Sequence, residues 1–144
     1  MSQSRNISRS FGSIVLNDAP LKSSSTSQVA ISAAPAASSL TVSATTVTAA
    51  QVLTGLLTQS PSSALTVTLP TSAAFLASLP GSAVGDSFVF TYINLNGTNA
   101  ATIAVDSGTG TLVGAAGVAL STSARFQFRF TSVTGSGTYT VYRL

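Results

Sequence analysis

The chain has 144 residues, a formal net charge of +3 and only 6% charged residues, whereas globular domains are usually about 25% charged. Its length corresponds to a single domain, and its surface has to be built mainly from Ser, Thr, Gly, Asn and Ala. Such a surface does little to oppose association through charge repulsion. The composition therefore favours a protein that packs against copies of itself or against a partner.

The residue inventory argues against catalysis. The chain has no Cys, His or Glu, its only acids are Asp18, Asp86 and Asp106, and its one lysine is Lys22. A serine nucleophile would have no histidine to activate it. Without cysteine there is no disulfide or thiolate site, and three scattered aspartates do not predict a metal centre. We expect a non-enzymatic protein with no cofactor, no metal and no small-molecule substrate.

No apolar run approaches the roughly 18 residues of a membrane helix. The longest apolar stretch near the start, residues 13–16, is also shorter than the apolar region of about 7 to 15 residues in a signal peptide. We therefore expect neither a membrane segment nor a secretory leader.

Residues 1–40 differ from the rest of the chain in composition and pattern, and they predict an extended N-terminal arm. Serine-rich and alanine-rich tracts interrupt any amphipathic period, so the arm cannot bury a core of its own and would become ordered only against something else. The candidate partner-binding residues of the arm are Arg5, Arg9, Phe11, Ile14, Val15, Leu16, Val29 and Ile31. A disordered tail is the other interpretation, although short apolar segments are not expected in a tail that remains in solvent. Two arginines are far fewer than a nucleic-acid-binding arm carries, so nucleic acid is not an expected partner.

Residues 41–144 carry the pattern of a β domain. Alternation predicts strands over residues 40–43 and 45–48. Thr48 and Gln51 then form a capping-box pattern that opens a short helix, which we expect to end near Gln59. Residues 62–69 return to strand alternation. Thr71 or Ser72 caps a second helix over residues 73–79, which Pro80 and Gly81 end.

The strand over residues 84–94 is the strongest apolar signal in the chain. It places aromatic residues on one face and apolar residues on the other, which predicts a strand in the middle of the core; these are Phe88, Phe90 and Tyr92, then Val89, Ile93 and Leu95. Asn96 and Gly97 follow, a pair typical of a type I′ hairpin turn. We therefore expect this strand to pair with residues 101–105.

Four further strands are predicted after the glycine-rich turn over residues 106–110, at residues 111–113, 117–120, 124–131 and 138–144. In the third of them Phe126, Phe128 and Phe130 alternate with polar residues, as in a half-buried strand with one wet face. Arg125 and Arg129 lie on the wet face, where they either pair with the carboxylates of Asp86 or Asp106 or contact a neighbouring subunit. Asp86 itself is expected to cap a turn through backbone amides.

The fold class predicted from these elements is mainly β. The strand spacing indicates an antiparallel β-sandwich or a jelly-roll-like barrel, with two short helices and an extended N-terminal arm. The predicted division is an arm over residues 1–40 and a β domain over residues 41–144.

Several motifs of the β domain recur together in a known group of proteins. They are Leu-Pro-Thr and a short helix at residues 69–80, Val-Gly-Asp-Ser-Phe at 84–88, residues 110–114 and 123–130, and Tyr-Thr-Val-Tyr-Arg-Leu at 139–144. Residues 45–144 thereby resemble a β domain of structural proteins from tailed phages and large algal DNA viruses. The resemblance implies a virion component of jelly-roll-like or related build, often trimeric, on the capsid surface or in a fibre.

Our first functional hypothesis is a capsid cement or decoration protein, a minor capsid protein located on the virion. Its β domain would form a homotrimer, and its arm would staple subunits of the major capsid protein. The alternative is a fibre or spike head that binds a host-surface glycan. Sugars usually stack on exposed aromatic rings, and here Trp is absent and Tyr139 and Tyr142 lie in a strand, which disfavours the alternative. A self-assembling shell or adhesin module from a cell also remains open.

Overall fold

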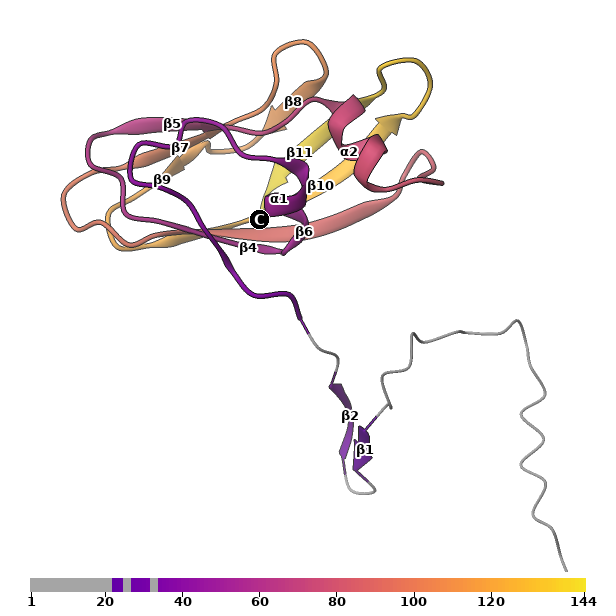
Figure 1. Ribbon diagram of the computed structural model, residues 1–144, viewed down its shortest axis with the longest axis horizontal. Coiled ribbons are helices and arrows are strands. Elements are labelled where there is room, and N and C mark those ends of the chain that lie inside the picture. Colours follow the sequence, from indigo (N-terminus) through magenta and orange to yellow (C-terminus); the bar gives the residue numbers. More distant parts are fainter. Residues whose placement is uncertain (1–21, 25–26, 32–33) are drawn as a thin grey trace, which may run out of the picture. The chain divides into compact units, whose positions relative to one another are not determined.

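The computed structural model describes residues 22–24, 27–31 and 34–144. The chain divides into two compact units, Met1–Ala33 and Ala34–Leu144. In the first unit, β1 (Lys22–Ser24) pairs antiparallel with β2 (Ser27–Ile31) (Figure 1). Val29 and Ile31 of the predicted arm contacts belong to β2, whereas the others, Arg5, Arg9, Phe11, Ile14, Val15 and Leu16, lie outside the described residues.

The second unit is mainly β and contains two short helices. Its elements are β3 (Ser38–Ser39), α1 (Ala49–Leu53), β4 (Leu56–Gln59), β5 (Leu65–Thr68), α2 (Ser72–Ser78), β6 (Ser87–Asn94), β7 (Ala101–Ala104), β8 (Gly110–Val113), β9 (Gly117–Val118), β10 (Ser123–Ser132) and β11 (Thr138–Arg143). One sheet has the order β3-β4-β6-β10-β11-β8 and the other β5-β7-β9. Within the described residues neither sheet closes into a barrel, because each has two edge strands.

The expectation of a purely antiparallel fold is wrong. Four strand pairs are parallel, namely β3 with β4, β4 with β6, β8 with β11, and β5 with β7. Parallel pairing needs a long connection between the two strands. The segment containing β5 and α2 makes such a connection between β4 and β6, which a pattern of strand spacing does not reveal.

The core lies between the two sheets, which form two layers (Figure 1). Side chains of β6 and β10 line the six-stranded sheet on its inner side, with Phe90 opposite Phe126 and Phe88 opposite Phe128. Their rings stack at centroid distances of 5.3 and 4.7 Å. Buried residues from the other sheet, Val67, Ala101, Ile103 and Val118, complete the core. The aromatic alternation seen in the sequence is thus the inner wall of the fold.

The outer side of β6 corrects the prediction that this strand has core on both faces. Val89 is 40% exposed and Leu95 is 60% exposed. No element of the unit Ala34–Leu144 covers this side of the sheet, so within that unit β6 has one buried face, as β10 has.

The first helix begins as predicted and ends earlier. The amide of Gln51 donates to the Thr48 hydroxyl at 3.2 Å and the Thr48 amide donates to Gln51 Oε1 at 2.8 Å, which confirms the capping box. Gly55, with φ of +79°, then turns the chain out of the helix. The predicted helical residues 56–59 instead form β4, where Leu57 is fully buried opposite Tyr92.

The second helix agrees with the prediction, since Thr71 caps it and Phe75 is fully buried. The two strands predicted over residues 40–48 are wrong, because this segment keeps only an isolated bridge between Thr46 and Thr68. The compact unit also begins earlier than the predicted boundary after residue 40. Ser38 and Ser39 pair with β4, and Leu40 is only 6% exposed.

The predicted hairpin at Asn96 and Gly97 is wrong. Neither residue has a positive φ, which a type I′ turn requires at both positions. Instead Asn96 Oδ1 accepts hydrogen bonds from the amides of Thr98 at 2.7 Å and Asn99 at 2.8 Å. The chain then crosses to the other sheet, where β7 pairs with β5 and β9.

Phe128 occupies the centre of the aromatic cluster, with ring centroids of Phe75, Phe88 and Tyr139 within 4.7 Å. We predict that Phe128→Ala lowers the free energy of unfolding by about 3 to 5 kcal/mol, because it removes the ring and leaves a cavity. Chemical denaturation of the full chain measures the loss. Gln127→Ala, on the outer side of the same strand, is the control and should cost less than about 1 kcal/mol. Equal losses in the two variants would contradict the assignment of the inner face.

Candidate functional site

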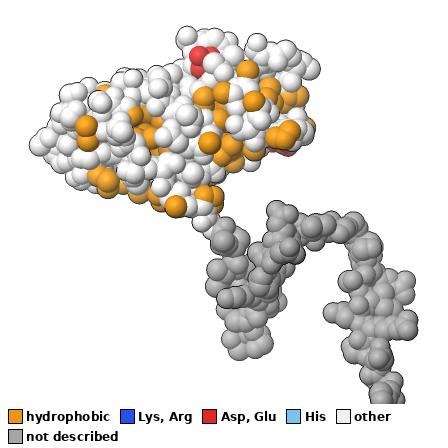
Figure 2. Space-filling model, in the orientation of Figure 1, with side chains coloured by type: hydrophobic (Ala, Val, Ile, Leu, Met, Phe, Trp, Pro, Cys, Tyr) orange, Lys and Arg blue, Asp and Glu red, His pale blue; other side chains and the backbone are white. Residues whose placement is uncertain are grey.

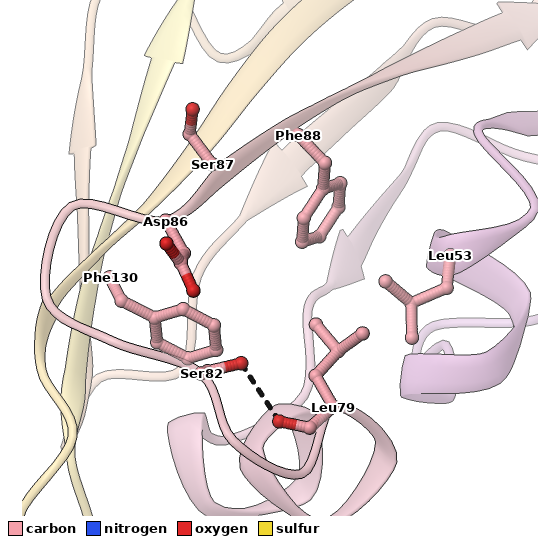
Figure 3. A pocket seen from close by; sticks show the side chains of 7 residues that line it. All are labelled: Leu53, Leu79, Ser82, Asp86, Ser87, Phe88 and Phe130. Carbon is pink, nitrogen blue, oxygen red and sulfur yellow. Dashed lines mark hydrogen bonds between the residues drawn. The ribbon is translucent and has the colours of Figure 1, made fainter. Parts of the chain in front are cut away.

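A pocket of about 320 Å³ opens where the two helices meet the six-stranded sheet. Its lining comprises Leu53, Leu79, Ser82, Asp86, Ser87, Phe88 and Phe130. Figure 3 shows Leu53, Leu79 and Phe88 pointing toward one another from α1, the end of α2 and β6, with Asp86 beside Phe130. The walls are therefore apolar, with one carboxylate among them.

The loop that carries Asp86 is held by backbone and side-chain hydrogen bonds. Asp86 Oδ2 accepts from the amide of Ala83 at 2.9 Å, which confirms that Asp86 caps a turn. The amide of Gly85 donates to the Phe130 carbonyl at 2.9 Å, and the Phe130 amide donates to the Asp86 carbonyl at 3.0 Å. The Asp86 carboxylate thus has a structural role. The pocket can hold an apolar group, and its one carboxylate, that of Asp86, is held in the turn by the Ala83 amide.

A second candidate site is the solvent-facing side of the six-stranded sheet, here called the outer face. It consists of the side chains that alternate with the buried ones, namely Leu56, Thr58, Ser87, Val89, Thr91, Ile93, Thr111, Val113, Ser123, Arg125, Gln127, Arg129, Thr131, Thr138, Thr140 and Tyr142. Its two charges are those of Arg125 and Arg129, both exposed. The structure therefore confirms that these two arginines lie on the wet face of their strand.

Strand register arranges the outer face in rows. One row runs across four strands from Val89 through Gln127 and Tyr142 to Val113. Arg125 and Arg129 lie two residues to either side of Gln127 on β10, so they flank this row on both sides. The centre of the outer face is therefore Gln127 and Tyr142, between the two guanidinium groups.

These arginines were predicted to pair with Asp86 or Asp106. Both carboxylates already accept hydrogen bonds within their own turns, and these bonds compete with an ion pair. Asp106 Oδ2 accepts from the Gly108 amide at 3.1 Å and from the Thr109 hydroxyl at 2.8 Å. Asp86 accepts from the Ala83 amide in the same way. Contact of Arg125 and Arg129 with a neighbouring subunit stays a prediction.

The third arginine of the β unit lies on the opposite side of the sheet. The Arg143 guanidinium carbon is 5.1 Å from the centroid of the Phe126 ring, within the range of a cation–π contact. Arg143 Nη1 also donates to the Gly117 carbonyl at 3.3 Å and so ties β11 to the other sheet. Arg143 is not among the residues predicted to form contacts, although alternation from Tyr139 and Val141 places it on the inner face.

Two of the three tyrosines are buried and serve the core. The Tyr92 hydroxyl donates to Gln59 Oε1 at 2.6 Å, and the Tyr139 hydroxyl donates to the Pro70 carbonyl at 2.9 Å and accepts from the Asp106 amide at 3.2 Å. Burial raises the pKa of Tyr92 and that of Tyr139 to about 12. Tyr142, half-buried on the outer face, is therefore the tyrosine that a ligand can reach.

No family model, curated protein or solved structure matches the chain. In the described ranges, no three His, Cys, Asp or Glu side chains gather into a group that could hold a metal ion. No helix among the described residues is long and apolar enough to cross a membrane. The candidate sites therefore have to be interpreted from their own geometry.

The raised pKa values of Tyr92 and Tyr139 predict a loss of stability in alkali. Below the ordinary tyrosine pKa of 10.0 both groups keep their protons in the folded and the unfolded chain. As the pH rises from 10.0 toward about 12, the unfolded chain ionises first, so the free energy of unfolding falls. Thermal melting and phenolate absorbance from about pH 8 to about pH 12 measure this. Tyr139→Phe should show a shallower fall. In a folded Tyr142→Phe variant, whose remaining tyrosines are Tyr92 and Tyr139, phenolate formation near pH 10.0 would refute the buried assignment.

Proposed function

We propose that this chain is a non-enzymatic structural protein of a virus particle, a capsid cement or decoration protein of the minor capsid class. The observation that carries the proposal is the broad outer face, which no element of the unit Ala34–Leu144 covers and which bears two charges, both positive. A surface of this kind suits permanent packing against other subunits, because few charged groups have to be stripped of water when contact forms.

The remaining described surface supports the same proposal. Figure 2 shows apolar atoms scattered among uncharged polar and backbone atoms, with only small patches of carboxylate on the side in view. Exposed apolar side chains away from the outer face include Val42, Val84 and Leu120. A chain with 6% charged residues has little charge with which to prevent association in solution. Stable assembly on a shell would occupy the surfaces through which such a chain associates.

We assign the β unit to the β-sandwich class, with the six-stranded sheet and the smaller β5-β7-β9 sheet as its layers. Sandwich and jelly-roll domains are common in viral capsids. The parallel pairs distinguish this unit from the usual antiparallel jelly roll, so the class supports a structural role only by analogy.

The arm is proposed to staple shell subunits. The 21 residues that precede β1 have a contour length of at most about 75 Å, which is enough to reach a neighbouring subunit. Docking orders the arm at an entropic cost, which burial of apolar residues such as Phe11 and Leu16 would offset. The arm and the β unit then act as two linked attachments whose combined affinity exceeds that of either alone.

One observation supports the alternative that the chain is a fibre head that binds a glycan. Tyr142 lies half-buried on the outer face beside Gln127, and a sugar could stack on its ring. The other two tyrosines are buried in the core. A single aromatic ring on a flat sheet is a weaker basis than the size and composition of the whole outer face.

The proposal predicts that the full chain and a form starting at Ala34 have the same oligomeric mass, that of a trimer, in light scattering. The shorter form should bind empty capsids at least about a hundredfold more weakly, because one of two linked attachments is lost. Co-sedimentation with empty capsids that lack this protein measures the binding.

The described core lies between Leu40 and Val141, so removal of residues 1–33 leaves it complete, and a melting curve of the shorter form checks folding. The double variant Phe11→Ser, Leu16→Ser tests the arm within the full chain. Equal capsid binding by all three forms would refute the staple. Absence of binding by the full chain would refute the cement assignment.

A further inference from the structure

The composition of the outer face matches the centre of a protein interface. Interface cores are enriched in Tyr and Arg and depleted in Lys, Asp and Glu. The outer face has Tyr142, Arg125 and Arg129 and contains no Lys, Asp or Glu. Val89 and Val113, which are 40% and 47% exposed, flank the central row and supply apolar area. Most binding energy in interfaces comes from central Tyr, Trp and Arg residues, the types found here in the middle of the face.

The size of the outer face also fits a protein partner. Strands β4, β6, β10, β11 and β8 are neighbours in one sheet, and at about 4.8 Å per strand they are roughly 20 Å wide. Strand β10 has 10 residues and extends over roughly 30 Å. Because β4 and β8 have only 4 residues each, the resulting area is on the order of 500 Å², more than half of the 800 Å² or so that each partner contributes to a stable interface. The outer face is the open side of a pleated sheet, whereas small ligands bind in concave sites.

The charge of the outer face selects among protein partners. A second copy that presented the same face would bring arginines against arginines, and like charges across an interface cost several kcal/mol or so. Described residues of a copy offer two carboxylate side chains, Asp86 and Asp106, which already accept hydrogen bonds in turns. A complementary partner is therefore a different protein with carboxylates on its surface.

We propose that the outer face is the surface by which the β unit docks on a carboxylate-bearing protein surface, which is that of the shell subunit. The inference rests on the proposed cement function and names the contact that the function requires. Arg125 and Arg129 are four residues apart on one strand, so they are separated by about 13 Å. Each guanidinium can take one carboxylate in a bidentate pair, while Tyr142 and Gln127 contact the surface between the two pairs.

The test compares variants of the full chain that are matched in charge. Arg125→Gln with Arg129→Gln removes two positive charges from the outer face. Ser63→Glu with Ser136→Glu changes the net charge equally at exposed loop positions outside both sheets. Co-sedimentation with empty capsids should show at least about tenfold weaker binding for the first pair and unchanged binding for the second. Arg125→Lys with Arg129→Lys should be intermediate, because Lys keeps the charge but loses the bidentate geometry. Binding of the native chain should also weaken with added salt.

Equal capsid binding by the native chain and the Gln pair would overturn the docking surface and leave the cement function intact. If the native chain does not bind capsids, the cement function fails and this inference fails with it. A Gln pair that loses its trimeric mass in light scattering but still binds capsids would assign the outer face to a subunit contact. Retention of the native chain, but not the Gln pair, on immobilised heparin or 3′-sialyllactose without capsid binding would assign it to an acidic glycan.

Discussion

Burial of the aromatic rings of β6 and β10 is the constraint on which the structure depends. Five of the seven phenylalanines occur at alternate positions in these two strands, so one face of the sheet has to be shielded from water. The register that sets Phe90 against Phe126 and Phe88 against Phe128 is fixed because a one-residue slip would expose every ring. The three-stranded sheet and Phe75 of α2 supply the cover.

Polar groups within this core hold the segments that lack regular structure. Gln59 accepts from the Tyr92 hydroxyl and donates to the carbonyls of Thr41 and Ala44 at 2.7 and 3.0 Å. These bonds replace a strand ladder for a segment that was expected to form strands. Tyr139 fixes the carbonyl of Pro70 in the same way. Each bond satisfies a group whose burial would otherwise be costly, so the tyrosines stabilise loops as well as packing.

Sequence patterns predicted correctly those features that depend only on interactions between residues close in sequence. The capping box at Thr48, the helix after Thr71 and the one-sided alternation of β10 need only neighbouring residues, and all three are confirmed. The predicted hairpin after β6 is wrong because β7 pairs with strands of the other sheet and not with β6. Local sequence does not determine which sheet a strand joins, and the Asn96 side chain stabilises a different turn. The exposure of Arg125 and Arg129 followed from alternation. The pocket could not be predicted, since its walls come from both helices, β6 and β10.

The outer face is uncovered because the two sheets differ in their number of strands. A sheet of six strands is covered on one side by a sheet of three strands and two short helices, and nothing else in the unit Ala34–Leu144 forms a third layer. An uncovered sheet face on a free-standing protein is usually rich in charge, since charge opposes association. Here it carries Thr, Val, Gln and Tyr with two arginines. The uncharged side chains among them can be exposed to solvent, and they can also be desolvated at low cost when a partner binds. The same shortage of charge that leaves the chain prone to association suits the outer face to the proposed contact, in which the two arginines would determine which partner fits.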